Sequence, residues 1–475
     1  MFLTRPSSQV PKGRAKSVFC CLLALLGFVF PNPARAEKVL FKGEGWEVYT
    51  DGRVGGFLSH VYGDGFPRPT FQLDSTGSAV PIRDISGGGF NSINEQKQLV
   101  DANHPDAQDL PGQGKVNVMR LRSGFIGNTF GFGVRGEIWP NLTFTGYLQL
   151  WAFIESEGRQ KNRPNYIDAR QGYAKIEGKY GSLLAGRTRA LFSRGATDID
   201  AQYAHRWGVG FPGSIDSNGP ALGQIGFGVL GSGFAAGIIY GTPSIAGFQL
   251  NVGIFDPIQL QGNGGWNRTK FGRPEAELTF EQKFGATGKV VLFANGAYQS
   301  VYKDGYCSSR VLDMTGKPAP CSATAAGAGY GGRFEYEFFR LGLAGHIGNG
   351  LGLNYALEVS DAAQDLAGNM RKFDGYYAQT QFVLGKFDLS AGAGIARVFL
   401  TANDNLAEPN PANPTGPAII RHSVIKHQLG ANAGVVYNLT PNLHFDLDFF
   451  RAEAKWYFGE KQVLYVANTG MILNW

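Results

Sequence analysis

The sequence predicts an all-β fold, a transmembrane antiparallel β-barrel of sixteen strands with short turns at one end and long loops at the other. Three observations predict this fold. From Glu37 onward no stretch keeps a helical periodicity, and the 68 Gly, 35 Phe and 19 Tyr of the chain suit strands and turns. Apolar and charged residues alternate along the candidate strands, and short and long connections alternate between those strands.

The first residues are expected to be a cleaved signal peptide. A basic region, an apolar run and a small-residue cleavage site follow one another at Lys12 to Lys16, Val18 to Phe30 and Ala34 to Ala36. The apolar run is too short to cross a bilayer as a helix, which needs about 20 apolar residues. We therefore predict a signal peptide over 1–36 and one barrel domain over 37–475.

Net charge argues against one class of partner. The whole chain has 44 Lys and Arg against 38 Asp and Glu. Removal of residues 1–36 deletes five basic residues and no acidic one, which leaves 39 against 38. A nucleic-acid function based on net charge therefore has no support, and no nucleic-acid partner is expected.

Sixteen strand candidates follow in the mature chain. They are Trp46 to Ser59, Val116 to Glu137, Leu142 to Ser156, two strands within Asp168 to Arg189, Ile225 to Tyr240, Gly247 to Phe255, Arg273 to Phe284, Lys289 to Tyr302, Gly329 to Phe338, Leu341 to Val359, Gly375 to Gly385, Phe387 to Phe399, Ser423 to Tyr437, Leu443 to Phe458 and Gln462 to Trp475.

Short turns and long segments alternate strictly between these candidates until the last hairpin. The long segments are 61–114, 157–168, 190–224, 256–272, 303–328, 360–374 and 401–421. Outer-membrane barrels have this asymmetry, with short periplasmic turns and long outer loops. An even number of strands and full closure also remove the unpaired edges that lipid does not tolerate.

The strand from Leu443 indicates which face meets water. Phe445 and Leu447 alternate with Asp446 and Asp448. A charged residue on the lipid face is costly, about 2–4 kcal/mol for Arg or Lys at mid-bilayer. The carboxylates are therefore expected to look inward, and an unpaired buried carboxylate needs water. The pattern predicts a water-filled interior.

The hairpin Asp168 to Arg189 has two alternating segments joined by a tight turn. On the first segment, Lys175 and Glu177 share a face. We expect Arg187 and Arg189 on the second segment to share that face, so that charges from both strands point inward. The segment 190–224 follows directly.

At these residues the chain resembles the general porins of the Gram-negative outer membrane, whose fourth and fifth strands have a similar RQ-aromatic, short turn and Gly-Arg pattern. Ile239 to Phe255 resembles the next hairpin of that family, and Thr469 to Trp475 resembles the C-terminal assembly signal of outer-membrane barrels, with Trp475 where Phe is usual. The resemblance implies a homotrimer, and it implies that the loop 190–224 folds back into the pore and narrows it. It also implies contact with the barrel assembly machinery through Trp475.

Ten residues are expected to line the pore or its constriction. They are Arg53, Arg120, Arg122, Arg187, Arg189, Arg194, Asp198, Asp200, Asp446 and Asp448. Basic and acidic groups that face each other across a narrow neck would sort ions and polar solutes by charge and size. The alternative for the arginines is that they pair with loop carboxylates and hold the loop against the wall. For Asp446 and Asp448 the alternatives are carboxylate chemistry or a divalent cation.

Cys307 and Cys321 lie in a segment rich in Gly, Ser and Ala, and an exported chain meets an oxidising periplasm. A loop disulfide is therefore expected, and neither a metal site nor a cofactor is. The seven histidines are scattered with no nucleophile motif beside them. We therefore expect no enzyme activity.

The most consistent hypothesis is an outer-membrane porin for passive diffusion of ions and small hydrophilic solutes, in contact with outer-membrane lipid and lipopolysaccharide. Two alternatives stay open: a substrate-selective channel for a sugar, anion or dicarboxylate, and a plugged structural or adhesive barrel. The length of the first loop, 61–114, makes the substrate-selective channel the runner-up to a general pore.

Overall fold

The computed structural model describes residues 37–64, 71–73, 79–81, 115–123, 127–152, 168–201, 223–257, 266–269, 271–303, 322–354, 356–357, 363, 369–402, 404, 407–408, 419–420, 425–457 and 461–475. The chain divides into two units, Met1–Arg35 and Ala36–Trp475, and every described residue belongs to the second. Within the described ranges, no helix is long and apolar enough to cross a membrane.

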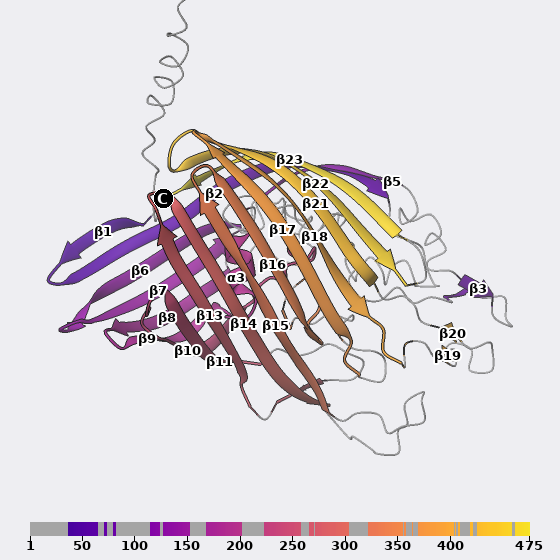
Figure 1. The fold of residues 1–475 in the computed structure, drawn as a ribbon, viewed down its shortest axis with the longest axis horizontal. Coiled ribbons are helices and arrows are strands. Elements are labelled where there is room, and N and C mark those ends of the chain that lie inside the picture. Colours follow the sequence, from indigo (N-terminus) through magenta and orange to yellow (C-terminus); the bar gives the residue numbers. More distant parts are fainter. Residues whose placement is uncertain are drawn as a thin grey trace, which may run out of the picture. The chain divides into compact units, whose positions relative to one another are not determined.

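Sixteen strands close into one antiparallel barrel, as predicted (Figure 1). Each strand pairs with the next along the wall, and the last pairs with the first. The wall strands are β2 (Trp46–Asp64), β6 (Asn128–Trp139), β7 (Leu142–Ala152), β8 (Asp168–Gly178), β9 (Gly181–Arg189), β10 (Phe234–Gly241), β11 (Phe248–Phe255), β13 (Arg273–Phe284), β14 (Gly288–Lys303), β15 (Ser322–Tyr336), β16 (Phe339–Asn349), β17 (Lys372–Leu384), β18 (Phe387–Phe399), β21 (Ile425–Asn438), β22 (Leu443–Trp456) and β23 (Lys461–Asn474).

The chain end completes the closure. Trp475 exchanges two backbone hydrogen bonds with Gly52 of β2, at 2.9 and 3.0 Å. Gly52 has no room for a side chain, because a Cβ there would lie 2.4 Å from the Trp475 ring. The last residue is therefore built into the seam between the first and last wall strands.

The remaining strands are short: β1 (Lys38–Gly43), β3 (Phe71–Leu73), β4 (Ala79–Pro81), β5 (Lys115–Arg122), β12 (Trp266–Arg268), β19 (Ala407–Glu408) and β20 (Ile419–Ile420). Three of them, β1, β5 and β12, belong to the barrel sheet, and β12 pairs with the outer end of β14. β1, which the sequence analysis missed, pairs with the start of β2, on the side where β23 pairs with its later residues. The single strand expected at 116–137 consists of two strands. β6 pairs with residues 46–53 of β2, and β5 pairs with residues 57–64.

Two predicted strands include stretches that leave the wall. The strand expected from Ile225 begins at Phe234, and the strand expected to reach Val359 ends at Asn349. Positive φ angles break both strands, at Gly226 (84°) and Gly228 (104°) in the first and at Gly350 (63°) and Gly352 (84°) in the second. Both apolar stretches turn into the barrel instead of continuing its wall.

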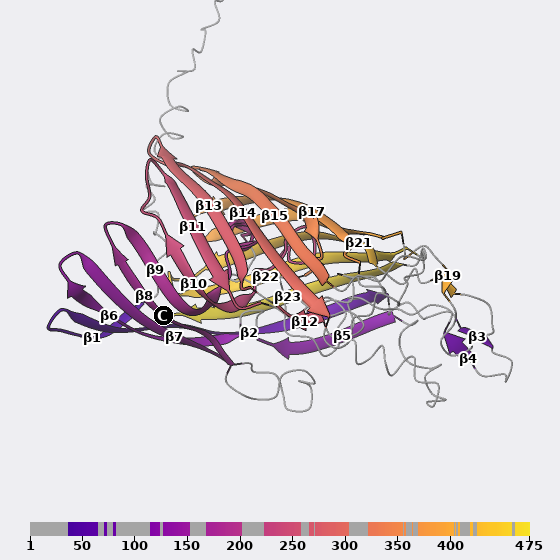
Figure 2. The same ribbon diagram turned by 90° about the horizontal axis from the view of Figure 1, so that it is seen from below.

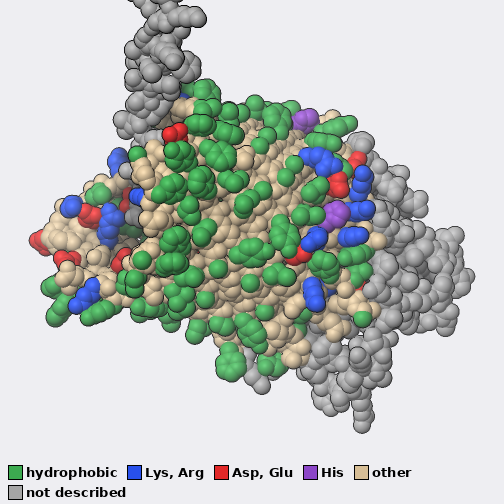
Figure 3. Space-filling model, in the orientation of Figure 1, with side chains coloured by type: hydrophobic (Ala, Val, Ile, Leu, Met, Phe, Trp, Pro, Cys, Tyr) green, Lys and Arg blue, Asp and Glu red, His purple; other side chains and the backbone are tan. Residues whose placement is uncertain are grey.

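The two faces of the wall differ as predicted. On β22, Phe445, Leu447 and Phe449 are 40%, 44% and 53% exposed, whereas Asp446 and Asp448 are buried. Figure 3 shows one outer face of the wall, on which apolar side chains form a broad field. Since lipid would cover this apolar exterior, the fold is that of a transmembrane porin-type barrel with its polar groups inside.

The interior is partly filled by the two stretches that turn inward, residues 223–233 and the described part of 351–357, which is 351–354 and 356–357. They hydrogen-bond to each other through Gly231 and Asn354 at 2.8 Å, and through Ala356 and Gly231 at 3.0 Å. Their apolar side chains pack in one cluster with inward residues of the outer half of the wall, including Phe227, Leu351, Phe450 and Trp456. The open part of the lumen therefore lies away from this cluster.

Candidate pore constriction

The loop that follows β9 carries a short helix, α3 (Arg194–Ile199), inside the barrel. The helix contacts β14, β15 and β16 (Figure 1). Along the wall, β14 and β15 lie on the far side of β13 from β9 (Figure 2). Its apolar face, Ala196 and Ile199, packs with Phe293 of β14 and Ala344 of β16. Gly195 allows this close approach, because a Cβ there would lie 2.3 Å from the Phe293 ring. The loop therefore folds into the pore, as expected.

Two glutamates on the inward face of β13 hold the start of this loop. Glu275 accepts a hydrogen bond from the Phe192 amide at 2.8 Å, and Glu277 accepts one from the Gly195 amide at 3.1 Å. Glu277 also forms a salt bridge with Arg194. Because the Glu277 side chain is only 2% exposed, its charge depends on these donors. Arg194 therefore holds the loop to the wall.

The other end of α3 is held by three further strands. Arg189, at the end of β9, donates to the Asp198 carboxylate at 2.7 Å. Arg333 of β15 donates to the Asp198 carbonyl at 3.4 Å. The Ala201 amide donates to Gln379 of β17 at 2.7 Å. The helix is thus fixed at both ends, and the Asp198 side chain stays 47% exposed to the lumen.

Asp200 turns away from the lumen's centre. It is 2% exposed and accepts a hydrogen bond from the Gln224 amide at 2.8 Å, which joins the outgoing and returning parts of the loop.

The wall near this loop has polar inward rows. Asp448 lies opposite Asn468 of β23, which in turn lies opposite Ser59 of β2. Asp446, two residues before Asp448 on the same face of β22, is 4% exposed. Arg53 of β2 lies opposite Thr129 of β6 and is 8% exposed. These residues lie on the inward face of their strands.

Arg187 is a correction. In the hairpin β8–β9 the register pairs Lys175 with Leu184, and Gly172 with Arg187. Directly opposed residues share a face, so Leu184 is on the inward face with Lys175. Arg187 falls on the outward face with Leu183, which is 48% exposed. The prediction of one shared charged face failed because it ignored the two-residue turn, which offsets the alternation of the two strands.

Several predicted residues cannot be placed in the same way. Arg120 and Arg122 lie opposite Ser59 and Phe57 by backbone register, but their side chains lie outside the described residues. Cys307, Cys321 and most of the loop 61–114 lie entirely outside the described residues.

The inward stretch 351–357 was missed by sequence reasoning. Leu351, Leu353 and Leu357 are at most 2% exposed, whereas the sequence pattern predicts a strand that continues to Val359. The signal that could have revealed the turn is the repeated glycine around Leu351, at Gly350 and Gly352, because a positive φ favours glycine.

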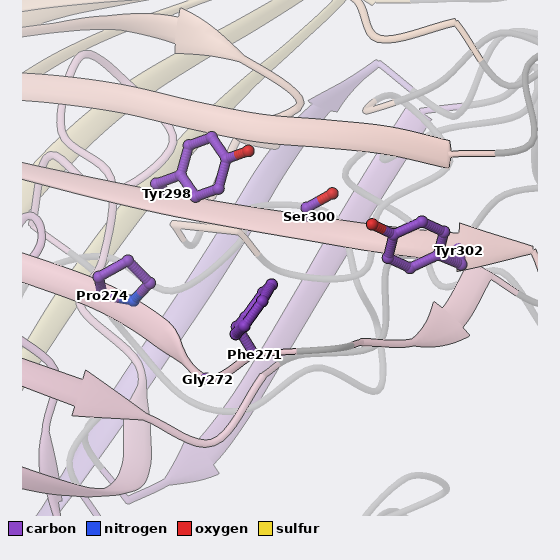
Figure 4. Close-up of a pocket in the computed structure, with 6 residues that line it drawn as sticks. All are labelled: Phe271, Gly272, Pro274, Tyr298, Ser300 and Tyr302. Carbon is purple, nitrogen blue, oxygen red and sulfur yellow. The ribbon is translucent and has the colours of Figure 1, made fainter.

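A pocket of about 190 Å³ lies outside the lumen, on the outward face of β13 and β14. Figure 4 shows Tyr298, Ser300 and Tyr302 of β14 along one side of it, with Phe271 and Pro274 on the other. None of its lining residues is charged. Among the described residues, no group of three or more His, Cys, Asp or Glu could hold a metal ion.

A closed sixteen-stranded barrel with an apolar exterior, polar inward rows and a loop held inside its lumen defines an outer-membrane channel. The protein-family comparison agrees: the model of the Gram-negative porins matches residues 41–455. The chain belongs to the Gram-negative porin family, and its role is passive diffusion across the outer membrane.

Solved structures of similar fold are also channels. The outer-membrane channel DcaP of Acinetobacter baumannii has a TM-score of 0.58 and 11% sequence identity, over 92% of this chain and 100% of that one. The anion-selective porin from Comamonas acidovorans has a TM-score of 0.51 and 13% identity, over 90% of this chain and 100% of that one. At these identities the likeness concerns the fold. No curated protein sequence matches the chain.

Proposed function

We propose that ions and small hydrophilic solutes pass through a neck between α3 and the polar inward rows of β2, β22 and β23. The observation that carries this proposal is the half-exposed Asp198, on a helix fixed inside the barrel at both ends. Asp446, Asp448 and Arg53 lie on the inward side of the wall but are at most 8% exposed, so they are proposed to act on the neck through the field of their charges. A neck with both signs of charge sorts solutes by charge and size.

In this proposal the arginines have two different roles. Arg189 and Arg194 are neutralised by Asp198 and Glu277 and position the helix. Arg53 lies on the inward wall and contributes to the field of the neck, together with the carboxylates of β22. Arg120 and Arg122 are proposed to add to the basic side, because their backbone register matches inward residues of β2.

The channel is proposed to be a general pore and not a catalytic barrel. The described histidines His60, His346, His427 and His444 lie on four different strands, β2, β16, β21 and β22. The sequence has no nucleophile motif beside any of them, which is the reason for proposing no catalysis. A substrate-selective channel is the second candidate, and the specific observation that favours it is the apolar packing of 223–233 and 351–357, which narrows the lumen.

We further propose a homotrimer, contacts with outer-membrane lipid and lipopolysaccharide, and assembly through the Trp475 end. Arg187 supports the trimer, because an arginine on the outward face of β9 fits a protein neighbour better than lipid. The signal peptide over 1–36 and the Cys307–Cys321 disulfide remain proposals of the same kind.

Single-channel recording of the refolded chain in a planar bilayer tests the function. A general pore gives stepwise ohmic currents that many solutes leave unchanged. A selective channel gives currents that one class of solute blocks in a saturable way. Absence of current from a barrel that shows heat-modifiable mobility on a gel would rule out both, and would leave a plugged structural barrel.

A further inference from the structure

The lumen face of β2, β6, β7 and β8 carries a row of tyrosines. Tyr49 of β2 lies opposite Gly133 of β6, which lies opposite Tyr147 of β7. Tyr147 in turn lies opposite Tyr173 of β8. Directly opposed residues share a face, and the alternate position Leu148, which is 45% exposed, marks the outer face. Tyr49, Tyr147 and Tyr173 are here called the tyrosine row, and Figure 2 shows β6, β7 and β8 side by side in this part of the wall.

The three rings of the tyrosine row form one continuous strip. The rings of Tyr49 and Tyr147 are stacked, with centroids 6.4 Å apart and 15° between their planes. The centroids of Tyr147 and Tyr173 are 5.4 Å apart. A Cβ at Gly133 would lie 2.1 Å from the Tyr49 ring, and one at Gly131 would lie 2.4 Å from the Tyr147 hydroxyl. The two glycines of β6 therefore let the strip lie against the backbone of the wall.

A second row, of hydrogen-bonding side chains, runs beside the tyrosine row. It consists of Asp51, Gln149 and Gln171, each two residues from a tyrosine of its own strand. The Tyr147 hydroxyl donates to the Asp51 carboxylate at 2.9 Å and accepts from the Gln149 amide at 3.3 Å. Gln171 donates to the Gln149 carbonyl oxygen at 3.0 Å. A side-chain amide has two N–H donors, so each glutamine has a second N–H besides the one in these bonds.

The charged side chains on the other side of the tyrosine row are paired. Arg135 of β6 forms a salt bridge of 2.8 Å with Glu47, and its guanidinium lies 4.7 Å from the centroid of the Tyr49 ring. Lys175 of β8 forms a salt bridge with Glu177. Because each cation has a carboxylate beside it, this part of the wall attracts a further ion only weakly. The surroundings of the strip suit a neutral solute.

Part of the strip is open to the lumen. Tyr147 and Tyr173, like Gln149 and Gln171, are partly exposed, whereas Tyr49 is only 4% exposed. Among the described residues, the apolar clusters inside the barrel include none of the three tyrosines. The stretches that fill the outer half of the barrel therefore do not account for an aromatic strip on this side of the lumen.

We propose that the tyrosine row and the row of Asp51, Gln149 and Gln171 bind a neutral cyclic sugar on its way through the lumen. The proposal rests on the second candidate function, a substrate-selective channel, and names its substrate class. A pyranose ring has an apolar face of C–H groups and an edge of hydroxyl groups. The C–H face matches the electron-rich face of a tyrosine ring, and the hydroxyl groups match amides and a carboxylate.

The arrangement has the usual composition of a small-molecule site, in which aromatic side chains supply contact area and a few fixed polar groups supply orientation. The hydrogen bonds between Asp51, Tyr147 and Gln149 hold these groups in place before a solute arrives. Little ordering is then required on binding. Among a sugar, an anion and a dicarboxylate, the paired charges at Arg135 and Lys175 favour the sugar.

The test records single-channel current through the full refolded mature chain in a planar bilayer. Three solutes are added in turn: maltotriose, sorbitol, which has hydroxyl groups but no ring, and succinate, a dicarboxylate. The test variant is Tyr173→Leu, which removes the ring, and Tyr173→Phe keeps the ring. The matched control is Tyr298→Leu, which removes a half-exposed tyrosine from the outer face, at the pocket of Figure 4.

We expect maltotriose to block the current of the unchanged chain in a saturable way, and sorbitol and succinate to leave it unchanged at the same concentration. The half-blocking concentration of maltotriose should rise about fivefold or more in Tyr173→Leu, because one stacking surface is lost. In Tyr173→Phe it should change by less than about twofold, since the ring is kept. Tyr298→Leu should behave like the unchanged chain.

Equal block of Tyr173→Leu and the unchanged chain by maltotriose would overturn the proposal. Block by sorbitol as strong as by maltotriose would also overturn it, and so would block by succinate alone. If Tyr173→Leu does not fold, Gln171→Ala replaces it with the same expectation. Ohmic currents that maltotriose leaves unchanged would refute this inference and leave the general pore, whereas absence of current would refute the channel function itself.

Discussion

Arg189 donates a hydrogen bond of 2.7 Å to Asp198, which ties the end of β9 to the helix inside the barrel. The same guanidinium also donates to Ser232 at 3.2 Å, in the returning part of the loop. One side chain thus connects the wall with both arms of the loop. Asp198 is half-exposed to the lumen, and its charge is balanced by Arg189, which also holds the loop in place.

Replacing Arg189 by Gln should increase the preference of the channel for cations, because Asp198 keeps its negative charge and loses its partner. The measurement is the reversal potential in a salt gradient. The shift should shrink toward 1 M salt, where the Debye length is about 3 Å. Arg187→Gln is the matched control, and it should leave the reversal potential unchanged because Arg187 is on the outward face. Equal shifts in both variants would contradict the assignment of faces.

Replacing Glu277 by Gln should loosen α3. The buried carboxylate accepts from the Gly195 amide and pairs with Arg194, and loss of hydrogen bonds to a charged group costs about 1.5–3 kcal/mol. Hydrogen exchange at the Gly195 amide should therefore speed up by about tenfold or more. Glu281→Gln, on the same strand but in an exposed pair with Lys289, should leave that exchange rate unchanged.

Replacing Gly195 by Ala should narrow the pore. The added Cβ would lie 2.3 Å from the Phe293 ring, so the helix must move off β14 toward the lumen. Single-channel conductance should fall. Gly233→Ala is the control, since nothing lies within 4 Å of a Cβ there. A conductance that stays the same in Gly195→Ala would mean that the wall strand yields and the helix keeps its place.

Replacing Leu351 by Ala should destabilise the barrel by about 2–5 kcal/mol, the usual cost of emptying a buried leucine site. Leu351 is 0% exposed among the inward loops, whereas Leu343 on the same segment of chain is 50% exposed on the outer face. Leu343→Ala should cost less than about 1 kcal/mol in detergent. Denaturant unfolding followed by tryptophan fluorescence measures both changes, and similar costs would argue against an inward position for Leu351.

The barrel itself could be predicted from the sequence because alternation and connection length are local signals. The row Phe445, Leu447 and Phe449 against Asp446 and Asp448 determines its own faces, because charges on the lipid side are costly. The strict alternation of short and long connections then predicts the number of strands, and it predicts which end of the barrel carries the short turns and which the long loops.

The inward stretches could not be predicted in the same way, because an apolar run suits lipid and a packed interior equally. Ile225, Phe227 and Leu353 pack inside the barrel against other inward residues. Their spacing in the sequence does not show whether they contact lipid or the interior. Gly228 is informative only after the fold is known, since a Cβ there would lie 2.1 Å from the Tyr376 carbonyl oxygen.

Only some residues of the constriction could be predicted, because several of their partners lie far away in the sequence. Arg189, Arg194 and Asp198 could be named from the hairpin and the loop that carry them, and Arg189 is close to Asp198 in the sequence. Glu277, the partner of Arg194, lies on a strand that only the closed barrel brings near. The face of Arg187 depended on the register of the β8–β9 turn, which shifts the alternation by one residue.

The most direct test of the neck is block of the current by a thiol reagent at Asp198→Cys. Asp198 is half-exposed on α3, so a bulky methanethiosulfonate should react from the aqueous phase and close most of the single-channel current. The unchanged chain should keep its current under the same reagent. Full labelling of the variant, verified by mass spectrometry, with a current that does not change would contradict the account, because ions would then pass by another route.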